Sequence, residues 1–518
     1  MPGKFEAPRG SRRPTRRPEP VKRPEATSRP EPNRRPDPAR RPEPTGRPDP
    51  NRRPTPTRRP RRKRRSPSVV IIPVLLILGL TVALLLSRCG GEKDPQGSLP
   101  RASAPTETAA ATAPSQPDVV ARATVASQGD VLMHKYLFTD NPSFPAASNL
   151  GEGKYNFDSI FQYVRPYIGE SDYAVINLET TLGGDDYPYS GNPLFNCPDP
   201  LADSLAGAGY DTILTANNHC ADTTVAGLKR TVEQIRNRNL TALGTQLSDQ
   251  EKKYTVVDVN GIKIGMFCYT YAAGLESDGS PNLNLNATTI VREKGVLNYF
   301  TADRLDQLYT ETQEILDDMK AEGAEATMLF IHWGTEYTLS QGGTYTMTQD
   351  ATQSAIAQKM CDLGIDVIVG GHPHVVEPMD LLTSSTDPEH KTVCIYSLGN
   401  AVSNQRREEM KMKTGHTEDG ALFTVTFEKN SLGAVQVSEA EVIPTWVNKF
   451  VNGEGKVEYN ILPLDESTRS QWQSLYGLTD AANAELQASF ERTMAIVGPG
   501  LNKCREYLGV STTPTTGE

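Results

Sequence analysis

The sequence predicts an α/β fold with a largely parallel sheet and antiparallel additions. From about residue 120 onward, short apolar runs of strand length alternate with longer runs of helical spacing. Several of the apolar runs end in segments that carry histidines, acids or amides. In open α/β sheets, ligands bind where the carboxyl ends of the strands meet. We therefore expect a functional site along that edge.

The first half of the globular region supplies the first strands and helices. Residues 121–127, 173–178 and 212–216 are short apolar strands, and residues 201–210 and 225–239 carry helical spacing. Two further strands, 256–259 and 262–269, flank Asn260-Gly261. This dipeptide favours the tight turn of a β-hairpin.

The second half repeats the alternation. An amphipathic helix over 302–321 leads into a strand over 327–331, and a helix over 351–363 leads into a strand over 366–369. A strand over 393–396 and strand-like sequence over 421–450 follow, and 466–508 is helical. We expect one domain over 119–450 and a helical C-terminal appendage over 451–518.

The N-terminal part has a different composition. Residues 1–65 carry 23 Lys/Arg and 7 Asp/Glu, a net charge of +16, whereas the remainder carries −25. Arg-Pro pairs recur every six residues from Arg17 to Arg59, which favours polyproline II and cannot form a core. This predicts a disordered tail over 1–67. We favour a solvated tail that fixes orientation over binding to anionic lipid, and we do not expect it to bind nucleic acid.

An uncharged run over 69–86 would form a helix of roughly 27 Å, close to the hydrocarbon thickness of a bilayer. We predict a single transmembrane helix over 68–88 and a flexible stalk over 89–118. Five basic residues, 61–65, precede the run, so the N-terminus should be cytoplasmic and the C-terminal domain extracellular, at the cell membrane. A cleaved signal peptide would have an unusually long basic region. A lipid-anchored Cys89 is disfavoured by Arg88 before it.

Five segments that follow apolar runs hold four of the seven histidines, which predicts a metal site. They are Gly129-Asp130, Asn177-Leu178-Glu179, Asn217-Asn218-His219, the run from His332 to Glu336, and Gly371-His372-Pro373-His374. Imidazole and carboxylate ligands suit zinc, manganese or iron better than calcium. A pair of such divalent ions would polarise a substrate oxygen and activate water.

Each candidate ligand also has a structural alternative. His372 and His374 could be surface histidines, His332 a core histidine, Asp130 a turn former and Glu179 an exposed strand-end charge. The position of each after a buried strand favours the ligand interpretation, with Glu179 between the two ions. Asn218 offers an amide oxygen. Its neighbour His219 could donate a proton, and Asp222 could orient that imidazole or cap the next helix.

These motifs, together with Ser397-Leu398-Gly399-Asn400, resemble in their order the CapA family of poly-gamma-glutamate capsule biosynthesis proteins. The resemblance covers roughly residues 122–430. That family is similar to calcineurin-like metallophosphoesterases, which implies a sandwich of two mixed sheets flanked by helices. It also implies the distribution of the ligands. Asp130 and His374 would hold one ion, Glu179 would bridge, Asn218, His332 and His372 would hold the other, and His219 would protonate the leaving group.

The chain departs from the phosphoesterase pattern at two motifs. Val131 and Leu132 follow Asp130, where the pattern has Asp-x-His, so His134 is the nearby substitute. Asn177 and Glu179 stand where the pattern has a Gly-Asp bridge. We therefore expect any extra metal ligands or substrate contacts to come from four residues: His134, Asn177, Glu336 and Asn400.

Two functions follow from these observations. The first is a metal-dependent hydrolase that acts outside the cell on a capsule or envelope polymer, at a phosphoester or a gamma-glutamyl amide. The second is a non-catalytic subunit that binds the polymer within a membrane complex for synthesis or export. Retention of the second-ion ligands favours chemistry, whereas loss of Asp-x-His favours binding.

Overall fold

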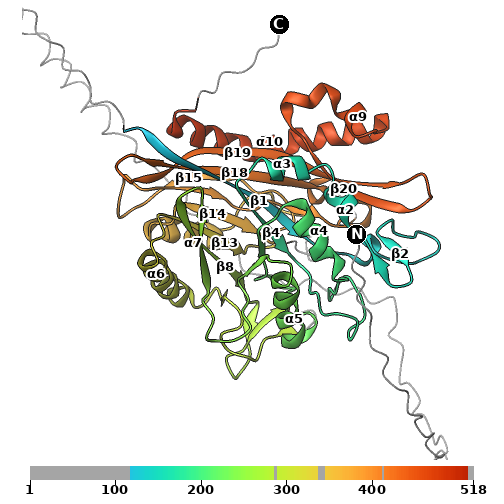
Figure 1. The fold of residues 1–518 in the computed structure, drawn as a ribbon, viewed down its shortest axis with the longest axis horizontal. Helices are drawn as coiled ribbons and strands as arrows, with labels where there is room; N and C mark the ends of the chain where they lie inside the picture. Colours follow the sequence, from blue (N-terminus) through green and yellow to red (C-terminus); the bar gives the residue numbers. More distant parts are fainter. Residues whose placement is uncertain (1–116, 285–288, 337–344, 411–413, 511–518) are drawn as a thin grey trace, which may run out of the picture. The chain divides into compact units, whose positions relative to one another are not determined.

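The structure, a computed structural model, describes residues 117–284, 289–336, 345–410 and 414–510. They form an α/β sandwich in which two mixed sheets face each other across a hydrophobic core (Figure 1). The predicted α/β class, with parallel strands and antiparallel additions, is confirmed.

The first sheet is parallel on one side and antiparallel on the other. Its strand order is β20-β19-β18-β1-β4-β5-β6, and β17 pairs in parallel with β1. Strands β18, β19 and β20 form an antiparallel meander beside β1, whereas β4, β5 and β6 continue the parallel half. The bounds are β1 Val119–Val131, β4 Tyr173–Leu178, β5 Thr212–Leu214, β6 Thr241–Leu243, β17 Asn400–Val402, β18 Asp419–Asn430, β19 Val435–Val451 and β20 Val457–Pro463.

The second sheet has the order β12-β8-β13-β14-β16-β15, with β7 paired to β8. All neighbours along it are parallel except the pairs β15–β16 and β7–β8. The predicted hairpin is formed by β7 and β8, and its turn residues Asn260 and Gly261 have φ of 53° and 85°. The bounds are β7 Tyr254–Val259, β8 Ile262–Tyr271, β12 Tyr299–Phe300, β13 Ala326–His332, β14 Val367–Gly371, β15 Met379–Thr383 and β16 Lys391–Ile395.

Short strands lie outside the two main sheets. Strands β2 and β3 form a small hairpin, and β9, β10 and β11 form a three-stranded sheet. Their bounds are β2 Asn149–Gly151, β3 Lys154–Tyr155, β9 Gly274–Leu275, β10 Pro281–Asn284 and β11 Thr289–Ile290.

The strands are apolar on both faces because each sheet is covered on both sides. Val125 and Phe330 face the core between the sheets, whereas their neighbours Ala126 and Leu329 face outer cores. Helices α2 to α5 contribute to the outer core of the first sheet, and α6 and α7 to that of the second. The bounds are α2 Asp158–Phe161, α3 Arg165–Gly169, α4 Pro200–Ala208, α5 Thr224–Arg236, α6 Leu305–Ala321, α7 Ala351–Asp362, α8 Arg407–Met410, α9 Trp472–Leu475 and α10 Asp480–Leu508, with 3-10 turns at Lys135–Leu137, His416–Glu418 and Glu466–Gln471.

The C-terminal region differs from the helical appendage predicted over 451–518. Strand β20 adds to the first sheet, and α10 packs on β19 of one sheet and β15 of the other (Figure 1). Helix α10 buries Val497, Leu501 and Cys504 in the core between the sheets. A Cβ at Gly500 would lie 1.7 Å from the carbonyl oxygen of Met379, so glycine permits this close contact. Up to residue 510, this region is an integral part of the domain.

The predicted tail (1–67), transmembrane helix (68–88) and almost all of the stalk (89–118) lie outside the described residues. Within the described ranges, no helix has both the length and the apolar character needed to cross a membrane. The six cysteines in these ranges are buried free thiols.

Candidate metal centre

Strand register brings the predicted ligands to one end of the sandwich. Asp130 on β1 pairs with Asn177 on β4 and with Asn400 on β17. In the second sheet, His332 at the end of β13 pairs with Gly371 at the end of β14. Since β1 and β4 are parallel, as are β13 and β14, the carboxyl ends of each pair share one edge, and residues far apart in sequence meet there. Asn400, the first residue of β17, lies at the same level as Asp130.

A glycine at 129 is required by the close approach of two backbones. A Cβ there would lie 1.9 Å from the carbonyl oxygen of Gly399. The amide of the next residue, Asp130, donates to the same oxygen at 3.0 Å. The dipeptide Gly129-Asp130 therefore locks β1 to the loop before β17 and fixes the position of the carboxylate.

The first ligand group consists of Asp130, Glu179 and His374, whose ligand atoms all lie within 4.8 Å of one another. His374 Nδ1 is 3.4 Å from Asp130 Oδ2, and His374 Nε2 is 3.7 Å from Glu179 Oε1. All three side chains are buried. One imidazole and two carboxylates at this spacing are a donor set for a divalent transition metal.

The second ligand group consists of Glu179, His332 and His372. His332 Nε2 lies 3.1 Å from His372 Nδ1 and 3.5 Å from Glu179 Oε1. Asn218 Oδ1 lies 2.8 Å from the same His332 nitrogen. Four donors thus surround one small volume, and Glu179 belongs to both groups.

Glu179 is the strongest indication that a cation fits here. Its side chain is fully buried, and among the described residues neither carboxylate oxygen accepts a hydrogen bond. A buried, unpaired carboxylate is costly, so such groups are normally paired or bound to a metal. A divalent ion held by these groups would offset the charge of this carboxylate.

The protonation states of the site fit the same interpretation. Burial, with the nearby charge of Asp130, raises the pKa of Glu179 well above its usual value. Burial lowers the pKa of His332 to about 3 and that of His372 well below its usual value. Burial opposes ionisation of Asp130, but its contacts with His374 and His332 outweigh this and lower its pKa. The imidazoles of His332 and His372 are therefore neutral, as ligands must be. Burial opposes protonation of His374, but its hydrogen bond to Asp130 and the nearby charge of Glu336 outweigh this and raise its pKa. A cation would favour the ionised form of Glu179, which burial disfavours.

Asn177 and Asn400, predicted as extra ligands or substrate contacts, bond to ligand side chains. Asn177 Nδ2 donates to Asp130 Oδ1 at 2.8 Å, and Asn177 Oδ1 accepts from Asn217 Nδ2 at 3.2 Å. Asn400 Oδ1 accepts from His374 Nδ1 at 3.0 Å. Because the contact with Asn400 engages Nδ1 of His374, Nε2 is the nitrogen directed at Glu179. Such partners orient metal ligands and fix their tautomers.

The turn that carries the paired histidines is strained. His372 and His374 have φ of 100° and 59°, a region that non-glycine residues seldom adopt. Strain of this kind persists only where the surrounding structure enforces it, and it is concentrated at functional sites. Here it directs the two imidazoles into different ligand groups.

His219 and Asp222 form a hydrogen-bonded pair beside the ligands. His219 Nδ1 lies 2.7 Å from Asp222 Oδ2, which also accepts from the amide of Phe195 at 2.6 Å. Neither residue belongs to a ligand group. Asp222 thus fixes the ring of His219, and its other oxygen, Oδ1, has no hydrogen-bond partner among the described residues, so the side chain does not cap α5.

An open pocket, here called the mouth pocket, lies in front of the ligands. Its volume is about 580 Å³. The residues that line it are Leu132, Asn192, Pro193, Phe195, Asn218, His219, Tyr271, Ala273, Leu283, Asn284, Gly334, Thr335, Glu336, His372, His374 and Gln405. The predicted proton donor and three predicted ligands therefore face a space that can admit a substrate.

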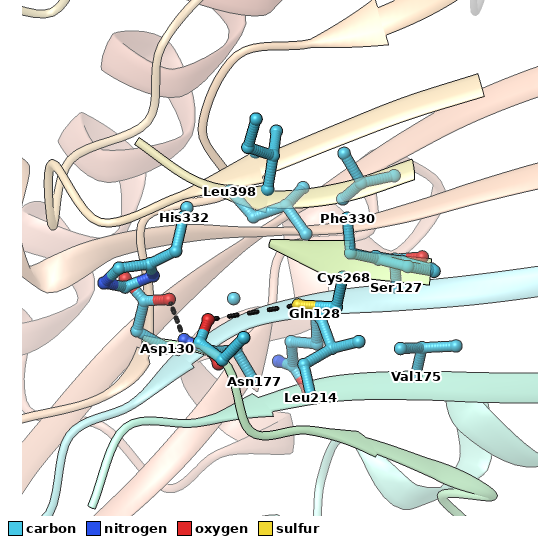
Figure 2. A pocket seen from close by; sticks show the side chains of 16 residues that line it. Ser127, Gln128, Asp130, Val175, Asn177, Leu214, Cys268, Phe330, His332 and Leu398 are labelled. Carbon is cyan, nitrogen blue, oxygen red and sulfur yellow. Dashed lines mark hydrogen bonds between the residues drawn. The ribbon is translucent and has the colours of Figure 1, made fainter. Parts of the chain in front are cut away.

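On the interior side, the ligands border a small cavity between the sheets. Figure 2 shows Asp130, Asn177 and His332 at one end of it and apolar side chains such as Phe330 and Val175 at the other. Its volume of about 20 Å³ is that of a single water site. Substrate access is therefore from the mouth pocket.

Glu336 and His134 lie near the ligands and belong to neither group. Glu336 lines the mouth pocket, with Oε1 3.9 Å from His372 Nδ1. The ring of His134 contacts Phe195, with centroids 5.2 Å apart. The structure thus places both at the periphery of the site.

Some residues of the site were not predicted. Tyr271 lines the mouth pocket, with its ring centroid 4.6 Å from that of His372. It lies at the end of β8, where the predicted strand stopped two residues early. Phe195 lies 4.6 Å from the ring of His219. It is in a loop with no motif of its own, so no sequence signal could have identified it.

Comparison with known proteins identifies a matching family and related sequences. The family described as bacterial capsule synthesis protein PGA_cap matches residues 124–405, more than half of the chain. A PGA biosynthesis protein CapA from Bacillus subtilis (strain 168) is 29% identical over 321 residues, covering 61% of this chain and 70% of that protein. A capsule biosynthesis protein CapA from Bacillus anthracis is 27% identical over 263 residues, covering 49% of this chain and 55% of its own length.

Among solved structures, a Staphylococcus aureus protein described as a 5′-nucleotidase, in complex with alpha-ketoglutarate, aligns with a TM-score of 0.36 and 15% identity. The alignment covers 64% of this chain and 56% of that one. A likeness of this extent carries no conclusion about the reaction.

Proposed function

The chain belongs to the bacterial capsule synthesis protein family PGA_cap, and from this premise we propose that it is a metal-dependent hydrolase of an envelope polymer or phosphoester. Its relatives named CapA take part in capsule biosynthesis, which supports a role in making or trimming a capsule polymer. The same proposal includes an arrangement of the metal ligands like that of metallophosphoesterases.

One observation carries the proposal. Glu179 lies between two histidine-containing groups, and neither of its oxygens accepts a hydrogen bond from a described residue. A polar core without a cation would leave this carboxylate unsatisfied at an energetic cost. We infer two divalent ions of manganese, zinc or iron, with Asp130 and His374 on one side and His332 and His372 on the other.

The residues of the chain have separate roles in this hydrolysis. The ions would supply Lewis-acid polarisation of a substrate oxygen. His219 lines the mouth pocket and would donate a proton to the leaving group. Asp222 would hold the ring of His219 through the 2.7 Å contact to Nδ1, so that Nε2 is the nitrogen that acts.

The cellular setting is also a proposal and rests on sequence. We propose that the run over 69–86 anchors the protein in the cell membrane with the N-terminus cytoplasmic, so that the described domain is extracellular. There it would meet the capsule polymer and any membrane subunits for synthesis or export.

A second function, non-catalytic binding of the polymer within such a complex, is favoured by one feature. The first motif lacks Asp-x-His, and His134 does not join either ligand group. If the loss of this motif weakens binding of the ion in the first ligand group, the site would bind the polymer without turnover.

Metal content and turnover, measured on one sample of the purified chain, test the proposal. Elemental mass spectrometry should give two divalent ions per chain, and hydrolysis of a phosphodiester or of poly-gamma-glutamate should depend on them. Metal without turnover on either substrate would leave the binding role. A chain that holds no metal would refute the hydrolase.

A further inference from the structure

The ring of His134 is held by a backbone contact that determines its tautomer. His134 Nδ1 lies 3.2 Å from the amide nitrogen of Asn404 and 3.2 Å from the carbonyl oxygen of Leu132. That carbonyl already accepts from the backbone amide of His134 at 2.9 Å. Among the described residues the amide of Asn404, a buried residue, has no other acceptor. Since buried amides are almost always paired, Nδ1 is the acceptor.

An accepting Nδ1 places the proton of a neutral ring on Nε2. Burial, the largest cause, lowers the pKa of His134 to about 3, so the ring is neutral at physiological pH. One nitrogen is therefore engaged with Asn404 and the other carries a hydrogen. Neither is free to bind a metal, which distinguishes His134 from His332, His372 and His374.

Asn404 is fixed from its other side. Its Oδ1 accepts from Lys449 Nζ at 2.9 Å and from Tyr459 OH at 2.7 Å. The ammonium of Lys449 also lies 5.6 Å from the ring centroid of Tyr136 and 5.7 Å from that of Tyr459. These contacts anchor the side chain of Asn404, and the backbone amide of the same residue donates to His134 Nδ1.

The position of His134 relates it to the proposed proton donor. Phe195, which lines the mouth pocket, contacts the ring of His134 at 5.2 Å and that of His219 at 4.6 Å, both edge-on. Each histidine has Nδ1 held by the protein, and the Nε2 of His134 has no hydrogen-bond partner among the described residues.

We propose that His134 is a substrate-contact residue whose Nε2–H donates to an oxygen of an oxyanionic group bound at the metal centre. Asn404, held by Lys449 and Tyr459, acts as its positioning residue. The inference rests on the proposed function for the metal centre. It assigns the pocket a substrate with at least one oxygen beyond those that the ions hold, as a phosphoryl group has.

The test uses inorganic phosphate as the probe on the full-length, metal-loaded protein. His134→Asn keeps an acceptor near the amide of Asn404 and removes the Nε2 donor, whereas His134→Gln returns a donor near the Nε2 position. A hydrogen bond to a charged group corresponds to about a 10- to 100-fold change in affinity. We expect H134N to weaken phosphate binding by about that factor and H134Q to restore part of it, with metal content unchanged in both.

His390→Asn is the matched control. His390 lines a different pocket, with Asp366 and Tyr507, and its Nε2 lies 3.1 Å from the carbonyl oxygen of Ile365. Phosphate affinity in H390N should equal that of the wild type. Loss of an ion in H134N would make His134 a ligand and overturn the proposal, as would unchanged phosphate affinity in H134N.

Ring nitrogen NMR of His134 keeps the two proposals separate. The metal-free chain should show a protonated Nε2 and an unprotonated Nδ1 from pH 6 to 8. A protonated Nδ1 would overturn the inference. A wild-type chain that binds no metal or catalyses nothing would refute the hydrolase, and the ring tautomer would still decide for or against this donor.

Discussion

Nε2 of His332 and Nδ1 of His372 lie 3.1 Å apart, with Asn218 Oδ1 2.8 Å and Glu179 Oε1 3.5 Å from the same His332 nitrogen. Ligands on one ion with bonds of about 2.0–2.1 Å are separated from one another by roughly 3 Å. Two imidazole nitrogens and a carboxylate oxygen at these distances are spaced as the ligands of one ion would be.

Replacing Glu179 by Gln should affect metal binding and stability in opposite directions. The variant should lose both ions, because Glu179 belongs to both ligand groups. Without metal it should be more stable than the wild type at pH 8, by about 1–3 kcal/mol, since a buried unpaired carboxylate is removed. Elemental analysis and urea unfolding in chelator measure the two effects. A variant that retains two ions would show that Glu179 is not shared.

The two histidines of the Gly-His-Pro-His turn should lose metal separately. His372→Ala should remove the ion of the second group and His374→Ala that of the first, since each imidazole serves one group. We expect one ion per chain in each single variant and none in the double variant, by elemental mass spectrometry. His390→Ala is the control and should keep two. Two ions per chain in the double variant would refute the assignment of this metal centre.

Glu377 should make stability depend on pH. Burial raises its pKa to about 7 from 4.5, and its Oε2 accepts from Gln353 Nε2 at 2.7 Å. Between these values the folded carboxyl keeps a proton that the unfolded one releases, so its stabilising contribution is complete below pH 4.5 and is lost as pH rises through 7.

Glu377→Gln keeps an acceptor for Gln353 and removes this titration. The free energy of unfolding, measured in urea at pH 5 and pH 8, should rise in the variant relative to the wild type between these two pH values. The difference should be at most about 3 kcal/mol. The exposed Glu454→Gln is the control. The prediction would be contradicted if the free energy of unfolding changed between pH 5 and pH 8 by the same amount in E377Q and in the wild type.

Helix α10 should contribute to global stability through one ion pair. Arg492 on α10 donates to both oxygens of Asp419 at 2.8 and 2.7 Å, and Asp419 is buried at the start of β18. Arg492→Ala leaves this carboxylate unpaired and should destabilise the domain by about 3 kcal/mol. Lys503→Ala, which removes a more exposed pair between α10 and Asp380, should cost about 0.5 kcal/mol or less. Equal effects would mean that α10 is a peripheral appendage.

Local signals explain which parts of the fold could be predicted. The strand over 173–178 was predicted with the bounds that β4 has, because an apolar run buried on both faces is bounded by polar residues. The Asn260-Gly261 turn was predicted because its left-handed backbone restricts the residue types. The ends of β13 and β14 were predicted one and two residues early, at 331 and 369, but the same apolar-run signal still placed His332 and His372 at or just after a strand end.

Most of the rest depends on contacts that no local pattern reveals. Residues 457–461 alternate apolar and polar side chains, a strand signal that the assignment to a helical appendage overlooked. The pairing of β20 with β19 is what makes this segment part of the first sheet. Asn177 and Asn400 were recognised as site residues, but their contacts with Asp130 and His374 follow from the register of β1, β4 and β17. The tautomer of His134 depends on Asn404, which is 270 positions away.

The direction of strand β1 also determines through which end the domain can be immobilised without blocking the site. It begins at Val119 and carries Asp130 near its other end, so roughly 36 Å of extended chain separates the two. Anything attached ahead of residue 119, such as an affinity tag or a sensor chip, is joined at the end of the strand remote from the mouth pocket. Immobilisation through that terminus should leave the metal centre accessible to soluble polymer, whereas coupling through loops near residue 192 would obstruct it.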